Sequence, residues 1–112
     1  MQYTFELEGQ ALIVTLQGEL DLHTSPEFKD KLTALFQTHS SITSLIMNVK
    51  GLSFIDSSGL GVILGRYREL QERGGRLFFV QANPQIKRIL QMSGFQKISE
   101  FADSTSDVFD RI

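Results

Sequence analysis

The sequence predicts an α/β fold: an opening antiparallel hairpin followed by a mostly parallel sheet, four to five strands in all. Residues 3–8 alternate apolar and polar side chains, which is the two-residue period of a half-buried strand. Short apolar runs at 45–49 and 77–80 then alternate with segments of helical period. Strands that alternate with helices favour parallel pairing through right-handed crossovers.

The first 40 residues predict a hairpin and a helix. Gly9-Gln10 is typical of a tight turn between strands at 3–8 and 11–17, because glycine accepts a positive φ. Residues 18–21 are expected to leave the sheet as a loop. Thr24 and Glu27 have the spacing of a capping box with proline between them, so a helix is expected to begin there. Its apolar face comprises Phe28, Leu32, Leu35 and Phe36.

The second half of the chain predicts three more helices. The apolar face of the first comprises Leu60, Ile63, Leu64, Tyr67 and Leu70, and Gly74-Gly75 ends that helix. The second is capped by Asn83 and ended by Gly94, and its apolar face comprises Ile86, Ile89 and Leu90. Lys97-Ile98 is expected to be a short edge strand, and residues 104–112 a last helix that buries Val108, Phe109 and Ile112. No linker or repeat interrupts this order, so residues 1–112 are expected to form one domain.

Composition excludes several classes of function. The 112 residues include no cysteine, which rules out disulfides, thiol chemistry and Cys-based metal sites. The net charge of −2 provides no chain-wide basic field for nucleic acid or anionic lipid. The N-terminus has no secretory signal pattern, and the apolar runs are far shorter than the roughly 20 residues of a membrane helix. We therefore expect a cytoplasmic protein that binds neither nucleic acid nor membrane.

The segment Asp56-Ser57-Ser58-Gly59 lies where a strand has ended and a helix is about to begin. Ordinary N-capping by short polar side chains accounts for such a segment. Two features favour a function as well. Two consecutive hydroxyls beside a carboxylate exceed what one cap requires, and glycines at 59, 61 and 65 each cost the helix about 1 kcal/mol relative to alanine. Tight packing on the sheet explains some of that cost, and close approach by another protein's backbone explains the rest.

A phosphate on Ser57 would add roughly −1.5 to −2 charges at neutral pH. A helix N-terminus tolerates that charge, so the domain should stay folded when modified. The energetic cost should then fall on a partner surface, where Asp56 and Asp21 already make the field negative. This is a switch by interface electrostatics.

Enzymatic alternatives fail on spacing. Neither the dinucleotide fingerprint, the P-loop nor the nucleophile elbow is complete around residues 55–67. His23 and His39 are the only histidines and are expected to be solvated or packing residues. A small hydrolase or phosphotransferase that uses Asp56 and Ser57 stays as an alternative, although it lacks a base in obvious reach. We expect no enzymatic activity, no cofactor and no metal.

The five cations that follow Ser57 on the two later helices are expected to form solvated faces, or to meet an acidic patch on a partner. They are Arg66, Arg68, Arg73, Lys87 and Arg88.

Residues 54–67, from Phe54 through the serine pair to Tyr67, closely resemble the signature of STAS-domain anti-sigma factor antagonists. Residues 18–21 with Thr24 look like that family's second motif, and residues 86–95 are similar to its third. The resemblance covers nearly the whole chain. It looks closest to the sporulation antagonists, with the general stress-response antagonists as the alternative; a ligand-sensing or scaffold STAS module is a further reading.

The resemblance implies a STAS fold, with helices mainly on one face of the sheet, and a partner-switching cycle. The unphosphorylated protein would bind an anti-sigma factor that is also a serine kinase, and so release a sigma factor. That kinase, using ATP and Mg²⁺, would phosphorylate Ser57 and then no longer bind the modified protein. A metal-dependent serine phosphatase would remove the phosphate. The partner-binding residues that the resemblance implies are Asp21, Thr24, Asp56, Ser57, Ser58, Gly59, Leu60 and Gly61.

Overall fold

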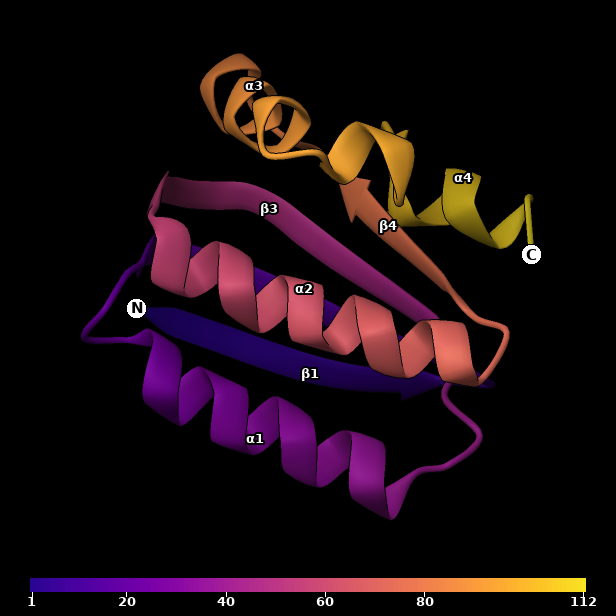
Figure 1. Cartoon of the computed structure of the whole chain (residues 1–112). Helices are drawn as coiled ribbons and strands as arrows, with labels where there is room; N and C mark the ends of the chain where they lie inside the picture. The colour runs from indigo at the N-terminus through magenta and orange to yellow at the C-terminus, as the bar shows by residue number, and fades with distance from the viewer.

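The computed structural model describes all of residues 1–112 as a five-stranded mixed sheet with four α-helices (Figure 1). Strand order in the sheet follows the chain, β1-β2-β3-β4-β5. Only β1 and β2 are antiparallel; the later neighbours are parallel. The elements are β1 Gln2–Glu8, β2 Ala11–Leu20, α1 Ser25–Thr38, β3 Ser44–Ile55, α2 Ser57–Glu72, β4 Arg76–Val80, α3 Pro84–Met92, a 3-10 turn η1 Phe95–Lys97, β5 Glu100–Ala102 and α4 Thr105–Phe109. The predicted fold class is confirmed.

The sheet separates two apolar layers, because successive side chains of a strand point to opposite faces. The larger cluster of 21 buried residues lies on the face covered by α1, α2 and α3, and includes Phe28, Phe36 and Phe79. Alternate residues of the central strands, among them Ile46 and Phe78, form a smaller cluster of 6 with Val108 of α4. Helices therefore lie mainly on one face, as expected, and α4 alone covers the other (Figure 1).

The two central strands are longer than their apolar runs predicted. β2 continues through residues 18–20 and β3 through residues 52–55, which pair with one another after two register shifts. Residues 18–20 are a loop in the sequence-based prediction, and the strand predicted at 45–49 stops short of residues 52–55. Parallel ladder hydrogen bonds and the burial of Leu20, Leu52 and Ile55 extend the strands instead.

The C-terminal predictions need correction. Lys97 ends the 3-10 turn and Ile98 follows it, while the edge strand is β5, three residues later than expected. α4 spans five residues and ends at Phe109, so Ile112 lies outside the helix and is 50% exposed. Val108 is fully buried, as predicted.

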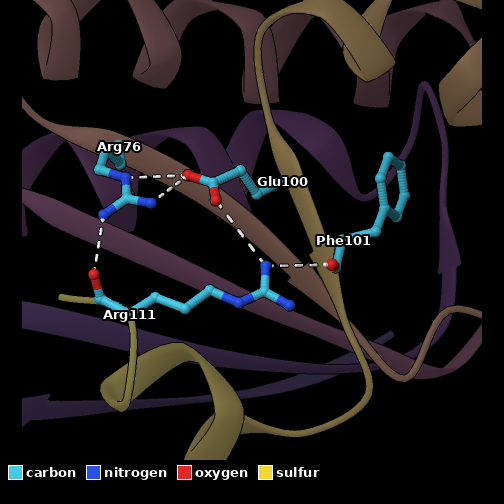
Figure 2. A network of polar contacts seen from close by, with 4 residues as sticks. All are labelled: Arg76, Glu100, Phe101 and Arg111. Atoms are coloured by element: carbon cyan, nitrogen blue, oxygen red, sulfur yellow. Dashed lines mark hydrogen bonds and ion pairs between the residues drawn. The ribbon is translucent and has the colours of Figure 1, made fainter.

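An ion-pair network holds this terminus to the sheet (Figure 2). Two nitrogens of Arg76 in β4 donate to one Glu100 oxygen of β5 at 2.6 and 2.8 Å, and Arg111 lies 3.7 Å from the other oxygen. Arg111 also donates to the Phe101 carbonyl and accepts from Arg76 through its own carbonyl. Because these charged side chains are about two-fifths exposed, each pair contributes at most about 1 kcal/mol.

Two of the cations expected on solvated faces are bound within the domain instead. Arg66 is only 7% exposed, and its guanidinium lies between Thr33 of α1 and Glu69 of its own helix. Arg73 ends α2 and donates to the backbone carbonyls of Phe36, His39 and Ile42. Both side chains tie α2 to α1 and its following loop, a use that the cationic spacing alone does not reveal.

Candidate functional site

The candidate site lies at the edge of the sheet where the parallel strands β2 and β3 end together. Leu20, the last residue of β2, pairs with Ile55, the last of β3. The Asp56 amide then donates to the Leu20 carbonyl at 3.2 Å, and α2 begins at Ser57. The loop at residues 21–24 and the start of α2 are therefore neighbours, although more than 30 residues separate them in the chain.

Asp56 joins these two segments through its carboxylate. One oxygen accepts from the backbone N–H groups of Ser58 at 2.9 Å and Gly59 at 3.2 Å, which is the predicted N-cap. The other oxygen accepts from the Leu22 N–H at 3.0 Å. Both oxygens are thus engaged by backbone donors, which leaves Asp56 poorly placed to act as a general base for Ser57.

Asp21 and Thr24 fold the neighbouring loop on itself. An Asp21 carboxylate oxygen accepts from the N–H groups of His23 at 2.9 Å and Thr24 at 3.0 Å. The Thr24 hydroxyl accepts from the Asp21 N–H at 2.9 Å and donates to the Glu19 carbonyl at 2.8 Å. The hydrogen bond from the Thr24 N–H has the largest effect and lowers the pKa of Asp21 below its ordinary value. Desolvation opposes it, and the hydrogen bond from the His23 N–H lowers the pKa further.

The predicted capping box at the start of α1 is wrong. Thr24 is the N-cap, but its side chain makes no capping hydrogen bond because the loop contacts above occupy its hydroxyl. Glu27 accepts instead from the phenol of Tyr3 at 2.9 Å. The spacing correctly places the helix start, and the tertiary structure gives both side chains other partners.

The first turn of α2 divides the remaining candidate residues into exposed and buried ones. Ser57 and Gly61 are exposed, whereas Ser58 and Leu60 are half-buried and Leu60 packs against the core. Gly59 is buried, and a Cβ there would lie 2.7 Å from the Leu20 carbonyl oxygen. Ser57 is therefore the hydroxyl that a second protein can reach most directly.

Comparison with known proteins identifies the family of this chain. The STAS domain family matches residues 3–108. A protein of Paenibacillus polymyxa named anti-sigma F factor antagonist is 39% identical over 104 residues, covering 93% of this chain and 88% of that one. The chain belongs to the STAS family of anti-sigma factor antagonists. A structure of SpoIIAA in its unphosphorylated form is similar, with a TM-score of 0.79 and 30% identity over 98% of this chain and 96% of that one. A structure of Bacillus SpoIIAA in the phosphorylated form has a TM-score of 0.78 and 31% identity, and the match covers 98% of each chain.

Two exposed apolar side chains of this STAS domain flank the site, and the sequence assigns no binding role to either. Leu22 is 66% exposed in the loop that Asp56 holds, and Phe54 is 46% exposed two residues before Asp56. Contiguous apolar patches are typical of protein-binding surfaces, whereas singly exposed apolar side chains are common on any protein surface. The signal for Leu22 was an apolar residue amid the loop's polar ones; Phe54 gave no signal, because its position in a strand was not foreseen.

Nowhere do three or more histidine and acidic side chains gather in a way that could hold a metal ion. None of the helices combines the length and hydrophobicity of a membrane span. The N–H of Leu22 donates to Asp56 and that of His23 donates to Asp21, so the two carboxylates accept from consecutive backbone groups of the loop.

Proposed function

We propose that this antagonist is a phosphorylation switch whose acceptor is Ser57. Unphosphorylated, it binds an anti-sigma factor that is also a serine kinase, and so frees a sigma factor. The kinase uses ATP and Mg²⁺ to phosphorylate Ser57 and loses affinity for the product, and a metal-dependent phosphatase restores the starting state. The domain itself acts by binding and needs no cofactor. The names of its relatives favour the sporulation sigma factor F over a general stress-response factor.

The observation that carries the proposal is the position of Ser57 relative to Asp56. Ser57 is exposed at the first position of α2, and the N–H groups of Ser58 and Gly59 are already occupied by the Asp56 carboxylate. A phosphate on Ser57 therefore competes with an existing cap for the helix N–H groups, and it adds a dianion next to a carboxylate. The phosphate would be directed outward, toward whatever protein covers Leu22 and Phe54.

The proposed binding residues serve this switch in two ways. Ser57, Ser58 and Gly61 face the partner directly or line its approach, together with Leu22 and Phe54. Asp21, Thr24 and Asp56 act by holding the loop and the helix start in register, and Gly59 and Leu60 by packing α2 on the sheet. Two relatives of known structure support the cycle, since the titles of the SpoIIAA structures describe an unphosphorylated and a phosphorylated form.

The test is binding of three variants to the anti-sigma factor of the same organism, measured by calorimetry. Ser57→Ala should bind as the wild type does but resist phosphorylation, whereas Ser57→Asp should lose about tenfold or more in affinity, or ~1.4 kcal/mol. Ser106→Asp is the matched control, because Ser106 is an exposed serine in the first turn of α4 on the opposite face. It should bind normally.

Kinase and ATP provide the second half of the experiment. Mass spectrometry should find a single phosphoryl group, mapped to Ser57, and the modified protein should bind as weakly as Ser57→Asp. Equal binding by the wild type, Ser57→Asp and the kinase-treated protein would refute the switch. Hydrolysis of ester or nucleotide substrates that disappears in Ser57→Ala would instead favour the enzymatic alternative.

A further inference from the structure

One side of α2 is covered by neither the sheet nor α1. Ile63 is fully buried on the sheet, in the main core cluster. Gly61 and Gly65 line a groove of about 500 Å³ between α2 and α1. Successive helix residues are about 100° apart, which places three further apolar residues of α2 on the remaining side, turned away from α1. They are Leu60, Leu64 and Tyr67, and each is half-buried.

Ser57 lies at the start of this row. The four residues from Ser57 to Tyr67 that share this side are spaced by three, four and three residues, so they fall within about 80° of one another around the helix. The row is about 15 Å long. Apolar side chains at this spacing form a ridge of the kind that packs against a second helix. A protein that reaches the Ser57 hydroxyl can therefore continue along the same row.

α3 presents an apolar side to the same row. Lys87 lies over the ring of Phe101 in β5, 5.4 Å from its centroid, so that side of α3 faces the edge of the sheet. Ile89 and Met92 lie about 160° and 140° around the helix from Lys87 and are therefore turned away from β5. α2 lies between α1 and α3 on the shared face of the sheet, so this direction leads to α2 (Figure 1). Met92 is 76% exposed, the largest exposed fraction of any large apolar side chain here.

A hollow of about 270 Å³ adjoins the Tyr67 end of the row. Tyr67, Leu77 of β4 and Ile98, which follows η1, are among the residues that line it. An apolar surface therefore extends from Ser57 to this hollow. We call it the α2–α3 strip, and its apolar residues are Leu60, Leu64, Tyr67, Ile89, Met92 and Ile98. Contiguous apolar patches mark protein-binding surfaces, and methionine adapts its shape to a partner.

The charged residues that edge the α2–α3 strip are mainly cationic. Its exposed cations are Arg68 of α2, Arg88 of α3 and Lys97, which lines the hollow. None of the three forms an ion pair within the domain. One unpaired carboxylate, Glu72, lies a turn beyond Arg68, and Glu100 at the hollow is already bound by Arg76 and Arg111. The strip therefore carries uncompensated positive charge, which is complementary to carboxylates on a partner.

We propose that the α2–α3 strip binds an amphipathic helix of the anti-sigma factor whose apolar face is flanked by carboxylates. The apolar side chains of that helix pack between the α2 row and Met92, and its carboxylates approach Arg68 and Arg88. A phosphate on Ser57 adds negative charge at one end of the strip, which opposes the approach of an acidic segment. This inference rests on the proposed function and adds to it the surface that recognises the partner. It also gives a role to exposed cations of the two later helices.

Removal of one exposed side chain tests the apolar part. Met92→Ala should lower the affinity for the anti-sigma factor about threefold or more, as measured by calorimetry. Because the Met92 side chain is mostly exposed, the urea midpoint of the free protein should not change. Ile112→Ala is the matched control, since Ile112 is 50% exposed beside the β1–β2 turn, away from α2 and α3. Its affinity should stay within about twofold of the wild type.

Charge reversal tests the cationic part. In surface plasmon resonance, Arg88→Glu should slow association with the anti-sigma factor about fivefold at low salt, and the difference should shrink as salt rises because exposed charges are screened. Lys31→Glu is the matched control. It makes the same change in net charge at an exposed residue of α1 that lies over Tyr3, on the β1 side of the sheet. Its association rate should stay within about twofold of the wild type.

The methionines provide a direct readout. With ¹³C-methyl methionine, the Met92 signal should shift when the anti-sigma factor is added, whereas that of Met47, fully buried in β3, should not. If Met92→Ala and Arg88→Glu bind as the wild type does while Ser57→Asp does not, the strip is outside the interface and only the switch stands. If the wild type itself does not bind, the proposed function fails and this inference with it. Self-association that Met92→Ala abolishes, with unchanged affinity for the anti-sigma factor, would assign the strip to a second copy and overturn the inference.

Discussion

The sharpest stability prediction compares two substitutions of identical chemistry in one helix, Gly59→Ala and Gly65→Ala. At residue 59 the new Cβ would lie 2.7 Å from both the Leu20 Cγ and the Leu20 carbonyl oxygen, and 2.9 Å from the Ile55 Cγ1. Favourable carbon contacts are about 3.5–4.0 Å, so α2 must move by close to 1 Å. The backbone carbonyl of Leu20 cannot yield easily, because it also accepts the Asp56 amide.

The magnitudes follow from this geometry. Overpacking of this kind costs about 1–3 kcal/mol, and the better helix propensity of alanine returns up to about 1 kcal/mol. We expect Gly59→Ala to destabilise the domain by about 1–2 kcal/mol. Gly65→Ala meets nothing within 4 Å and should stabilise it by about 0.5–1 kcal/mol. The two variants should therefore differ by about 1.5–3 kcal/mol in free energy of unfolding.

Urea unfolding followed by far-ultraviolet circular dichroism measures this difference. With a slope of about 1–3 kcal/mol per molar urea for a small domain, the two midpoints should lie about 0.5–3 M apart, on opposite sides of the wild type. Equal midpoints, or a lower midpoint for Gly65→Ala, would show that the contacts around these two glycines are not those described above. Gly61→Ala, which also meets nothing within 4 Å, should behave as Gly65→Ala does.

Two further predictions concern the carboxylates of the site. Asp56→Ala should lower the free energy of unfolding by about 1–2 kcal/mol, because it removes the cap of α2, and should speed amide hydrogen exchange at Leu22. The control Asp103→Ala, at an exposed position, should be nearly neutral. Unchanged exchange at Leu22 would contradict the hydrogen bond from its N–H to Asp56. Because the pKa of Asp21 is lowered in the folded state, its stabilisation is present above its ordinary value of 3.8 and is lost as pH falls through the folded value. Urea midpoints measured against pH should fall less steeply in that acidic range for Asp21→Asn than for the wild type.

Helix positions and helix caps were the features most easily predicted. The Asn83 side chain accepts from the Ile86 N–H and α3 begins at Pro84, as the sequence indicates. Gly94 follows α3 with a φ of 92°, the conformation that suits glycine at the end of a helix. These predictions succeed because propensity, capping and apolar period are local properties that depend on residues within a turn or two.

The failures share a non-local cause. Whether residues 18–20 and 52–55 extend the strands depends on their pairing with each other across more than 30 residues. Arg66 is charged and would be expected at the surface, but its hydrogen bond to Thr33 and its ion pair with Glu69 allow it to be buried. Thr33 lies on another helix, α1, so the sequence around Arg66 does not reveal this contact. Ile112 is apolar but lies three residues beyond the end of α4, beside the β1–β2 turn, where it stays 50% exposed.

For the function, the sequence alone determined which atoms are available: a pair of hydroxyls beside a carboxylate at a helix start, in a motif long enough to indicate the family. It did so because chemistry and local conformation depend on side-chain type and order along the chain. Tertiary structure decided how those atoms are used. The parallel ends of β2 and β3 bring the Leu22 backbone to Asp56, which occupies the carboxylate and leaves Ser57 exposed. The same packing divides the glycines of α2 between the sheet and an open groove, because only the position of α1 and Leu20 in space tells those surfaces apart.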